Sequence, residues 1–236
     1  MHPQSASEKK HRKSRFEMPF PLVRLLALAI MKLAFRLDVK GVEAWQLLSL
    51  KTQGIILAGN HTGYLDSLAV LAACPRPFYF LMRHEVFGWA WVGKLVRYGN
   101  IIPIFAGREK RALVETVQYL RSGGTVCIFP EGRLSEDGSV GEFNPGVAFL
   151  QQKSERPIIP FAICGGYEAW AEGQPIPRFR PITVVFGAPI LPGEFTDRAA
   201  LTEAVRQRVQ ALLVAHYEPS GNADSVRRSL AGEVGG

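Results

Sequence analysis

The sequence of 236 residues has few of the residues on which disulfide frameworks and zinc sites depend. Its three cysteines, Cys74, Cys127 and Cys164, lie far apart, and no Cys-x-x-Cys or Cys/His cluster is present. This spacing indicates neither a disulfide framework nor a zinc site. It is typical of a protein from a reducing compartment.

Long uncharged apolar runs are also missing. In the apolar segment of residues 18–40, the longest uncharged run extends only from Leu25 to Met31. A membrane-spanning helix needs about 20 predominantly apolar residues, so a spanning helix is not the favoured interpretation of this segment. No small-residue cleavage site follows it, and a secretory signal is therefore not expected.

Two common catalytic signatures are absent as well. No serine lies in the Gly-x-Ser-x-Gly elbow that serine hydrolases need. Residues 88–95 match a phosphate-binding loop as far as Gly-Lys, but Leu95 stands where a magnesium-binding Ser or Thr is required. The sequence therefore argues against a serine hydrolase and against a nucleotide-binding enzyme.

Positive charge is present, but it is unevenly distributed. The formal net charge is +7, and residues 1–40 alone contain nine Lys or Arg against three acidic residues. A near-neutral body with a basic arm argues against a nucleic-acid binder and suits contact with an anionic surface. We expect residues 1–17 to be a disordered basic arm.

Residues 18–40 are predicted to form an amphipathic helix that lies on a membrane. At about 100° per residue, Arg24, Lys32 and Arg36 fall within an arc of roughly 120°. One basic face beside an apolar remainder suits the membrane interface, where the cations meet anionic headgroups. Two alternatives are a helix that packs on the core with solvated charges, and a spanning helix.

From residue 41 onward, apolar strands and helices alternate. We expect strands at 54–59, 78–82, 101–105, 125–130, 157–163 and 181–190, and helices at 67–73, 86–98, 109–124, 146–154 and 197–217. This alternation predicts an α/β fold with a mostly parallel central sheet covered by helices on both faces. The domain is expected over residues 41–218, with a flexible tail at 219–236.

The strand expected at 54–59 leads into Asn-His-Thr-Gly-Tyr-Leu-Asp, residues 60–66. Loops after parallel strands lie at the carboxyl edge of the sheet, where functional residues gather. If Asp66 held one ring nitrogen of His61, the imidazole would be oriented and able to take a proton from a hydroxyl. The alternative is that Asp66 caps the next helix and that His61 is an ordinary loop residue.

Two further loops contain an arginine next to glycine. Glu131, Gly132 and Arg133 follow another expected strand, and a guanidinium fork with backbone N–H groups at a glycine turn can hold a phosphate. Arg108 follows a third strand and would add a second phosphate contact. Each loop alone is more simply interpreted as a solvated turn. All three loops would nevertheless meet at one edge if their strands are neighbours.

Several of these segments resemble the motifs of the glycerolipid acyltransferases, which acylate glycerol-3-phosphate or 1-acylglycerol-3-phosphate. Residues 60–67, Asn-His-Thr-Gly-Tyr-Leu-Asp-Ser, resemble the first motif, with His and Asp separated by four residues. Phe-Pro-Glu-Gly at 129–132 resembles the third motif, and Ile-Ile-Pro-Phe-Ala-Ile at 158–163 the fourth. The resemblance covers residues 39–190, and the order of the motifs makes it specific.

The resemblance implies an O-acyltransferase that makes phosphatidic acid from 1-acylglycerol-3-phosphate in phospholipid synthesis. His61 would deprotonate the acceptor hydroxyl, and Asp66 would orient the imidazole. The acceptor phosphate would be bound by Arg108, Glu131, Gly132 and Arg133. The acyl donor would be acyl-CoA or acyl-carrier protein, with no cofactor and no metal. The enzyme would associate with anionic lipids at the cytoplasmic face of a membrane.

Three departures from the family pattern concern the acceptor. Arg108 follows an extra Ala-Gly after the second motif, and Arg133 and Leu134 stand where threonine and arginine are common. Phe-Asn-Pro-Gly at 143–146 replaces a segment that usually contains lysine. Other acceptors therefore stay open, namely other lysophospholipids or glycerol-3-phosphate, as do transacylation and an inactive lipid-binding relative.

Overall fold

The computed structural model describes residues 20–43, 48, 54–83, 101–104, 107 and 109–218. Outside the described residues lie the expected arm at 1–17, the expected helix at 86–98, Arg108 and the expected tail at 219–236.

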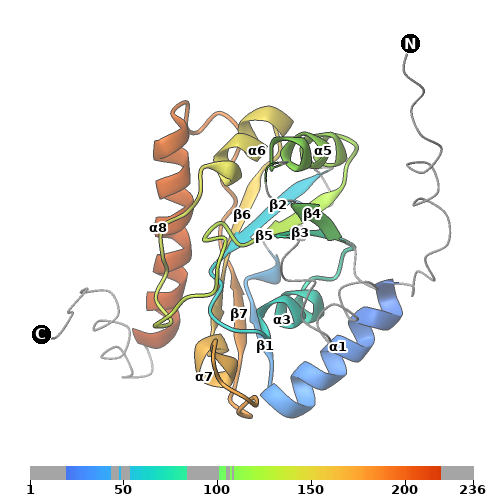
Figure 1. Cartoon of the computed structure of the whole chain (residues 1–236), viewed down its shortest axis with the longest axis vertical. Coiled ribbons are helices and arrows are strands. Elements are labelled where there is room, and N and C mark those ends of the chain that lie inside the picture. The colour runs from blue at the N-terminus through green and yellow to red at the C-terminus, as the bar shows by residue number, and fades with distance from the viewer. Residues whose placement is uncertain are drawn as a thin grey trace, which may run out of the picture.

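The described residues form one sheet of seven strands together with six helices (Figure 1). The strands are β1 (Asp38–Lys40), β2 (Ile55–Gly59), β3 (Tyr79–Arg83), β4 (Ile101–Ile104), β5 (Thr125–Ile128), β6 (Ile158–Cys164) and β7 (Thr183–Phe186). The helices are α1 (Phe20–Phe35), α3 (Asp66–Ala73), α5 (Glu109–Arg121), α6 (Gly146–Ser154), α7 (Gly166–Trp170) and α8 (Arg198–Tyr217).

The strands are ordered β1-β7-β6-β2-β5-β3-β4, so β2 lies in the middle of the sheet. The five strands from β6 to β4 are parallel, whereas β7 pairs antiparallel with β6 and β1 runs parallel to β7. The mostly parallel α/β fold predicted from the alternating pattern is confirmed. Because β5 and β6 flank β2, the loops after these three strands open at the same edge.

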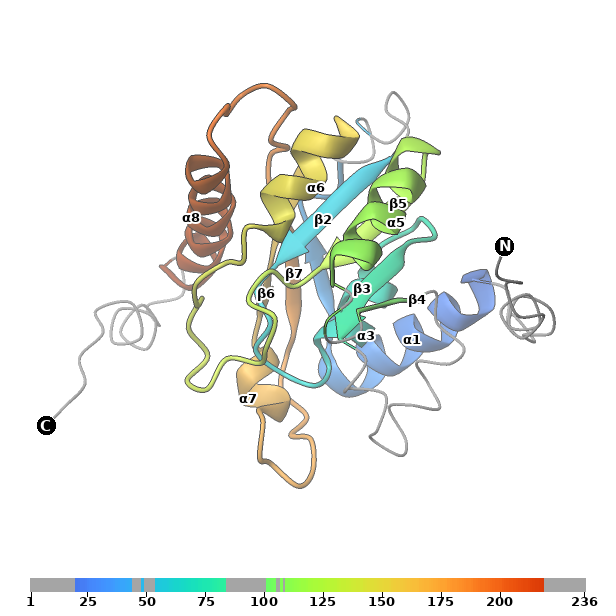
Figure 2. The ribbon, with the colours of Figure 1, turned by 45° about the horizontal axis from the view of Figure 1, so that its top comes forward.

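Helices cover both faces of the sheet: α1 and α3 lie on one face, and α5, α6 and α8 lie on the other (Figures 1 and 2). Alternate residues of β2 divide between the two cores. Ile55 and Leu57 face α1 and α3, whereas Ile56 and Ala58 face the other layer. A strand buried on both faces must be apolar at every position, and this explains the unbroken run in the sequence.

The segment at 18–40 differs from the expected single helix. Helix α1 ends at Phe35, and Arg36 adopts a left-handed backbone conformation with a φ of 46°. The chain then continues as β1, which pairs with β7. The last three residues of the expected membrane helix, Asp38–Lys40, therefore belong to the sheet.

The basic face predicted for α1 is not present as expected. Arg24 is turned toward the protein, where its Nε donates a hydrogen bond to the carbonyl of Cys74 (2.8 Å). Ala27, Met31 and Phe35 are buried against the core. The outward side is mostly apolar, with exposed side chains at Leu22, Leu25, Leu26, Ile30 and Leu33, and Lys32 is exposed with them. Within the described part of the chain, none of the helices is both long enough and apolar enough to cross a membrane.

Candidate active site

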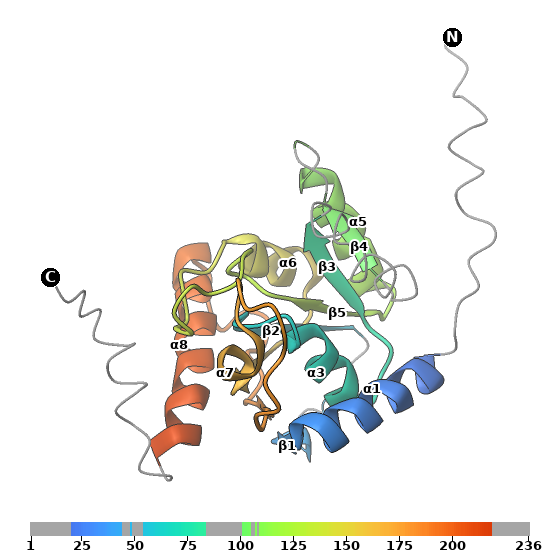
Figure 3. The same cartoon turned by 60° about the horizontal axis from the view of Figure 1, so that its bottom comes forward.

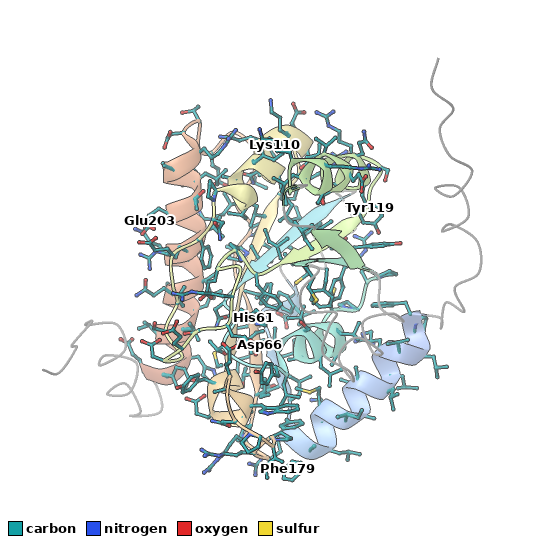
Figure 4. The ribbon with its side chains drawn as sticks, viewed as in Figure 1. His61, Asp66, Lys110, Tyr119, Phe179 and Glu203 are labelled. Carbon is teal, nitrogen blue, oxygen red and sulfur yellow. The ribbon has the colours of Figure 1, made fainter. Side chains whose placement is uncertain are left out.

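Loops that follow β2, β5 and β6 meet at the carboxyl edge of the sheet. Figure 4 shows His61 and Asp66 there, in the middle of the molecule above α7. The side chain of Asn60 holds two of these loops together, since its Oδ1 accepts from the N–H of Ile163 (2.8 Å) and its Nδ2 donates to the same residue's carbonyl (3.0 Å). The end of β2 is thereby tied to the end of β6.

The imidazole of His61 and the carboxylate of Asp66 form the pair that the sequence suggested. The distance between Nδ1 and Oδ2 is 3.0 Å, with Asp66 fully buried and the His61 side chain 23% exposed. The same Oδ2 accepts the backbone N–H groups of Thr62 (2.6 Å) and Gly63 (2.8 Å). Asp66 does not cap α3, because Leu65 occupies the N-cap position and no side chain caps there.

This contact decides what the other ring nitrogen can do. A carboxylate only accepts hydrogen bonds, so the hydrogen of a neutral imidazole belongs on Nδ1 and the lone pair on Nε2. The ring plane is fixed by Phe129, whose ring stacks on His61 with centroids 4.1 Å apart and planes inclined by 13°. Nε2 is thus held in place as a base for a proton from a hydroxyl.

The loop after β5 holds the backbone of His61 on both sides. The N–H of His61 donates to Oε1 of Glu131 (2.9 Å), and the N–H of Ser135 donates to the carbonyl of His61 (2.8 Å). The second oxygen of Glu131 accepts from the N–H of Gly141 (3.2 Å). Desolvation by burial raises the pKa of Glu131, an effect that these N–H groups partly oppose. The carboxylate expected near the acceptor phosphate therefore joins two loops.

The other two residues predicted in this loop point elsewhere. Gly132 has a φ of 72°, and its N–H closes a turn on the carbonyl of Phe129 (3.1 Å). The side chain of Arg133 is 75% exposed, and its Nη1 donates to Oε1 of Glu136 (2.8 Å). The structure thus brings His61, Asp66 and Glu131 together and leaves Arg133 in solvent.

Gly166 is a site residue that the sequence reasoning missed. A Cβ atom on Gly166 would lie 2.4 Å from Oδ1 of Asp66 and 2.8 Å from Oγ1 of Thr62. Within the described part of the chain, these two buried oxygens have no hydrogen-bond partner. Only a glycine lets the start of α7 approach the carboxylate this closely. The signal in the sequence was a Gly-Gly pair directly after a strand of the same edge.

The cysteines do not form a reactive group at this edge. Cys74, Cys127 and Cys164 are all buried. Burial raises the pKa of Cys74 and of Cys164 to about 12, which keeps both thiols protonated. Among the described residues, no cluster of three or more His, Cys, Asp or Glu side chains is placed to hold a metal ion.

The sequence pattern of the Acyltransferase family matches residues 36–164, which is more than half of the chain. The chain belongs to this family. The match begins just before β1 and ends with β6, so it includes His61, Asp66 and Glu131.

Two named relatives match parts of this chain at 28% and 30% identity. The 1-acyl-sn-glycerol-3-phosphate acyltransferase of Limnanthes douglasii is 28% identical over 145 residues, covering 60% of this chain and 52% of that protein. The enzyme of the same name from Neisseria gonorrhoeae is 30% identical over 104 residues, covering 42% of this chain and 39% of that one. The chain thus spans about half the length, or less, of these relatives.

The fold has a close counterpart among solved structures. The crystal structure of the 1-acyl-sn-glycerophosphate (LPA) acyltransferase PlsC from Thermotoga maritima superimposes with a TM-score of 0.65. The alignment covers 87% of this chain and 85% of that one at 23% identity. At this identity, the similarity establishes the shared fold.

Proposed function

We propose that this acyltransferase moves a fatty acyl group from a thioester donor to the free hydroxyl of 1-acylglycerol-3-phosphate. Phosphatidic acid would be the product. The observation that carries the proposal is the contact of 3.0 Å between His61 and Asp66, in which the other ring nitrogen is left as a base. Family membership and the names of the relatives from Limnanthes douglasii and Neisseria gonorrhoeae support the choice of reaction.

In the proposed mechanism, Nε2 of His61 removes the proton from the acceptor hydroxyl while the hydroxyl oxygen attacks the thioester carbonyl. No covalent enzyme intermediate forms. Asp66 keeps the ring hydrogen on Nδ1 and stabilises the imidazolium that results. The tetrahedral intermediate then expels the thiolate, which takes the proton from His61. Backbone N–H groups of the loop after β5 are proposed to stabilise the oxyanion.

Acceptor binding is assigned to the loops around the pair. We propose that Arg108, Arg133 and the backbone at Gly132 bind the acceptor phosphate, because guanidinium and backbone N–H groups suit that anion. Both carboxylate oxygens of Glu131 accept backbone N–H groups, so any contact of this residue with the acceptor would come from its backbone. Acyl-CoA or acyl-carrier protein would supply the acyl group, without a cofactor.

The acceptor is a membrane lipid, and α1 is the proposed contact with the membrane. Its exposed leucines form an apolar face opposite the side that packs on the core. Exposed apolar side chains along a surface helix suit the interface of a bilayer. We place the protein at the cytoplasmic face of a membrane with anionic lipids.

A second acceptor class is favoured by one observation. Arg133 lies in solvent and is paired with Glu136, so its guanidinium is not already directed at a phosphate beside His61. Transfer to the hydroxyl of other lysophospholipids, such as lysophosphatidylcholine, would use the same base and would not need that cation.

The two candidates are separated by an acceptor panel with purified protein. Acyl-CoA and acyl-carrier protein would each be offered with lysophosphatidate, glycerol-3-phosphate and lysophosphatidylcholine. Preferential transfer to lysophosphatidate supports the main proposal, and equal or faster transfer to lysophosphatidylcholine supports the second. Transfer that survives in His61→Ala would overturn both, because each requires the same base.

A further inference from the structure

The loop after α7, residues 171–181, combines exposed apolar side chains with arginines. Ile176 and Phe179 are each 70% exposed, and Arg178 and Arg180 are exposed beside them. Among the described residues, neither of these guanidinium groups takes part in an ion pair or a side-chain hydrogen bond. A large exposed apolar side chain flanked by two exposed arginines suits a boundary between acyl chains and lipid phosphates.

The backbone of the loop is fixed at several points. Three prolines restrict it, at positions 175, 177 and 181. The N–H of Arg178 donates to the carbonyl of Ala169 (2.7 Å), and the indole Nε1 of Trp170 donates to the carbonyl of Gln174 (2.9 Å). Ordering the loop on a surface would therefore cost little conformational entropy.

The loop packs against the C-terminal end of α1. The rings of Phe35 and Phe179 are in contact, with centroids 5.8 Å apart, and Nη2 of Arg36 reaches the carbonyl of Phe179 (3.5 Å). Leu33, in the last turn of α1, is 86% exposed. Figure 3 shows α1 and the loop after α7 on the same side of the molecule, and Figure 4 places Phe179 beside one end of α1.

We propose that the loop 171–181 is a second membrane contact of this protein. Ile176 and Phe179 insert among the acyl chains of an anionic bilayer, and Arg178 and Arg180 bind lipid phosphates. The inference rests on the proposed function, in which α1 lies on the same membrane. A second contact would restrict the orientation of the molecule on the bilayer. The loop follows α7 directly. The first residue of α7, Gly166, lies so close to Asp66 that an added Cβ would be 2.4 Å from Oδ1, so this orientation would set how the site faces its lipid acceptor.

Vesicle flotation with the full chain tests the contact. The double variant Ile176→Ser/Phe179→Ser should bind vesicles of phosphatidylcholine and phosphatidylglycerol about tenfold more weakly, or worse, because two apolar side chains no longer enter the bilayer. The matched control is Leu191→Ser, since Leu191 is also an exposed apolar residue (47%) but lies in the loop before α8. This control should bind as the wild type does. Equal binding by the double variant and the wild type would overturn the inference.

The arginines are tested by their dependence on lipid charge. Arg178→Gln/Arg180→Gln should weaken binding to the anionic vesicles roughly tenfold. Binding to vesicles of phosphatidylcholine alone should not change. The control Arg121→Gln/Lys153→Gln removes two exposed cations at α5 and α6 and should have no effect. An equal loss in test and control pairs would show a general charge effect and contradict a specific loop contact.

A label in the loop gives a measurement that does not depend on the contact between Phe179 and Phe35. All three native cysteines are buried, so an environment-sensitive dye can be placed selectively at Ile176→Cys. Its emission should shift to shorter wavelength when anionic vesicles are added, and the same dye at Leu191→Cys should not shift. Identical behaviour of the two labels would contradict insertion.

Vesicle flotation and dye emission are measured without acyl transfer. Their results are therefore independent of the test of the proposed activity. A chain that inserts the labelled loop but transfers no acyl group would refute the activity and retain the membrane contact. A chain that acylates a dispersed short-chain acceptor, and whose loop variants bind vesicles normally, would retain the activity and refute the contact.

Discussion

The loop after β2 and the loop after β5 meet at one edge of the sheet, yet their polar side chains are used differently. In the first loop, Asp66 is fully buried and one of its oxygens holds three donors, while the imidazole of His61 is stacked on Phe129. In the second loop, Glu131 is turned inward to the backbone of His61, but Arg133 extends into solvent.

Under the proposed function, this difference would separate the residues that act in proton transfer from those that select the acceptor. A general base works only if its ring is held in one orientation, and the first loop is built for that. An exposed arginine can change its partner without disturbing the fold, since a surface ion pair contributes only about 0–1 kcal/mol to stability. We therefore expect His61, Asp66 and Glu131, the inner residues, to control kcat. We expect Arg133, the outer residue, to control the affinity for the acceptor.

The largest effect should come from the base itself. His61→Ala removes the only proposed proton acceptor and should lower kcat roughly 10²–10⁴-fold. The free energy of unfolding should fall by about 1–3 kcal/mol, because the buried carboxylate of Asp66 loses the imidazole that faces it. Acyl transfer under saturating acceptor and thermal unfolding are the two measurements. If His61→Ala unfolds cooperatively and keeps most of its kcat, His61 is not the base of the reaction.

The second-largest effect is expected from Gly166→Ala, which tests the position of Asp66 without substituting Asp66 itself. Gly166→Ala places a methyl group 2.4 Å from Oδ1 of Asp66, which must push the carboxylate away from the imidazole. A displacement of this size should lower kcat about 10–100-fold. The matched control is Gly146→Ala at the start of α6, where a Cβ would meet only Leu113, at 3.9 Å. If both variants keep wild-type kcat, the position of Asp66 is not critical.

The third effect tests the link between the two loops. Glu131→Gln offers only one acceptor to the N–H groups of His61 and Gly141, so one buried donor loses its partner. We expect a loss of stability of about 1–3 kcal/mol. We also expect a decrease in kcat of about tenfold from looser placement of His61. The control Glu136→Gln changes an exposed carboxylate of the same loop and should leave stability and kcat nearly unchanged.

The same variant gives a pH signature. Burial raises the pKa of Glu131, so the folded protein holds this proton to higher pH than the unfolded chain does. Between the unfolded and the folded pKa, stability falls as pH rises, because the folded state binds more protons there. Glu131→Gln lacks this component. Denaturation by urea across this range should therefore show the stability advantage of the wild type over the variant shrinking as pH rises.

The sequence predicted the sheet and the contact between His61 and Asp66 for a shared reason. An unbroken apolar run such as Ile55–Gly59 must be a strand buried on both faces, and the polar residues that follow it lie at the carboxyl edge. His61 lies in the loop after β2 and Asp66 begins α3 five positions later, so little tertiary information was needed to bring them together. Their contact was predicted as one of two interpretations, and the structure selects it over the cap.

The features that the sequence missed depend on elements distant in the chain. The inward turn of Glu131 requires β5 to lie beside β2, and the close approach of Gly166 requires β6 on the other side. For Arg24, helical spacing predicted a shared basic face, but the carbonyl of Cys74 at the end of α3 supplies an inward partner. Periodicity describes a single element and contains no information about such partners.

The smallest effect is expected for Arg133, the exposed residue of the loop after β5. Arg133→Ala should change the free energy of unfolding by less than about 1 kcal/mol, since its ion pair with Glu136 is exposed. If Arg133 contacts the acceptor phosphate, KM for lysophosphatidate should rise about tenfold with kcat kept, because a contact made equally in ground and transition states affects binding alone.

Two comparisons test whether Arg133 affects acceptor binding and not the reaction step. Transfer to lysophosphatidylcholine should respond less to Arg133→Ala, because the choline headgroup neutralises the charge that the guanidinium would bind. Glu136→Ala removes the partner of Arg133 and should lower KM for lysophosphatidate, or leave it unchanged, since the guanidinium is then free for the phosphate. A fall in kcat in Arg133→Ala, with KM unaltered, would instead place this exposed arginine among the residues that act on the reaction itself.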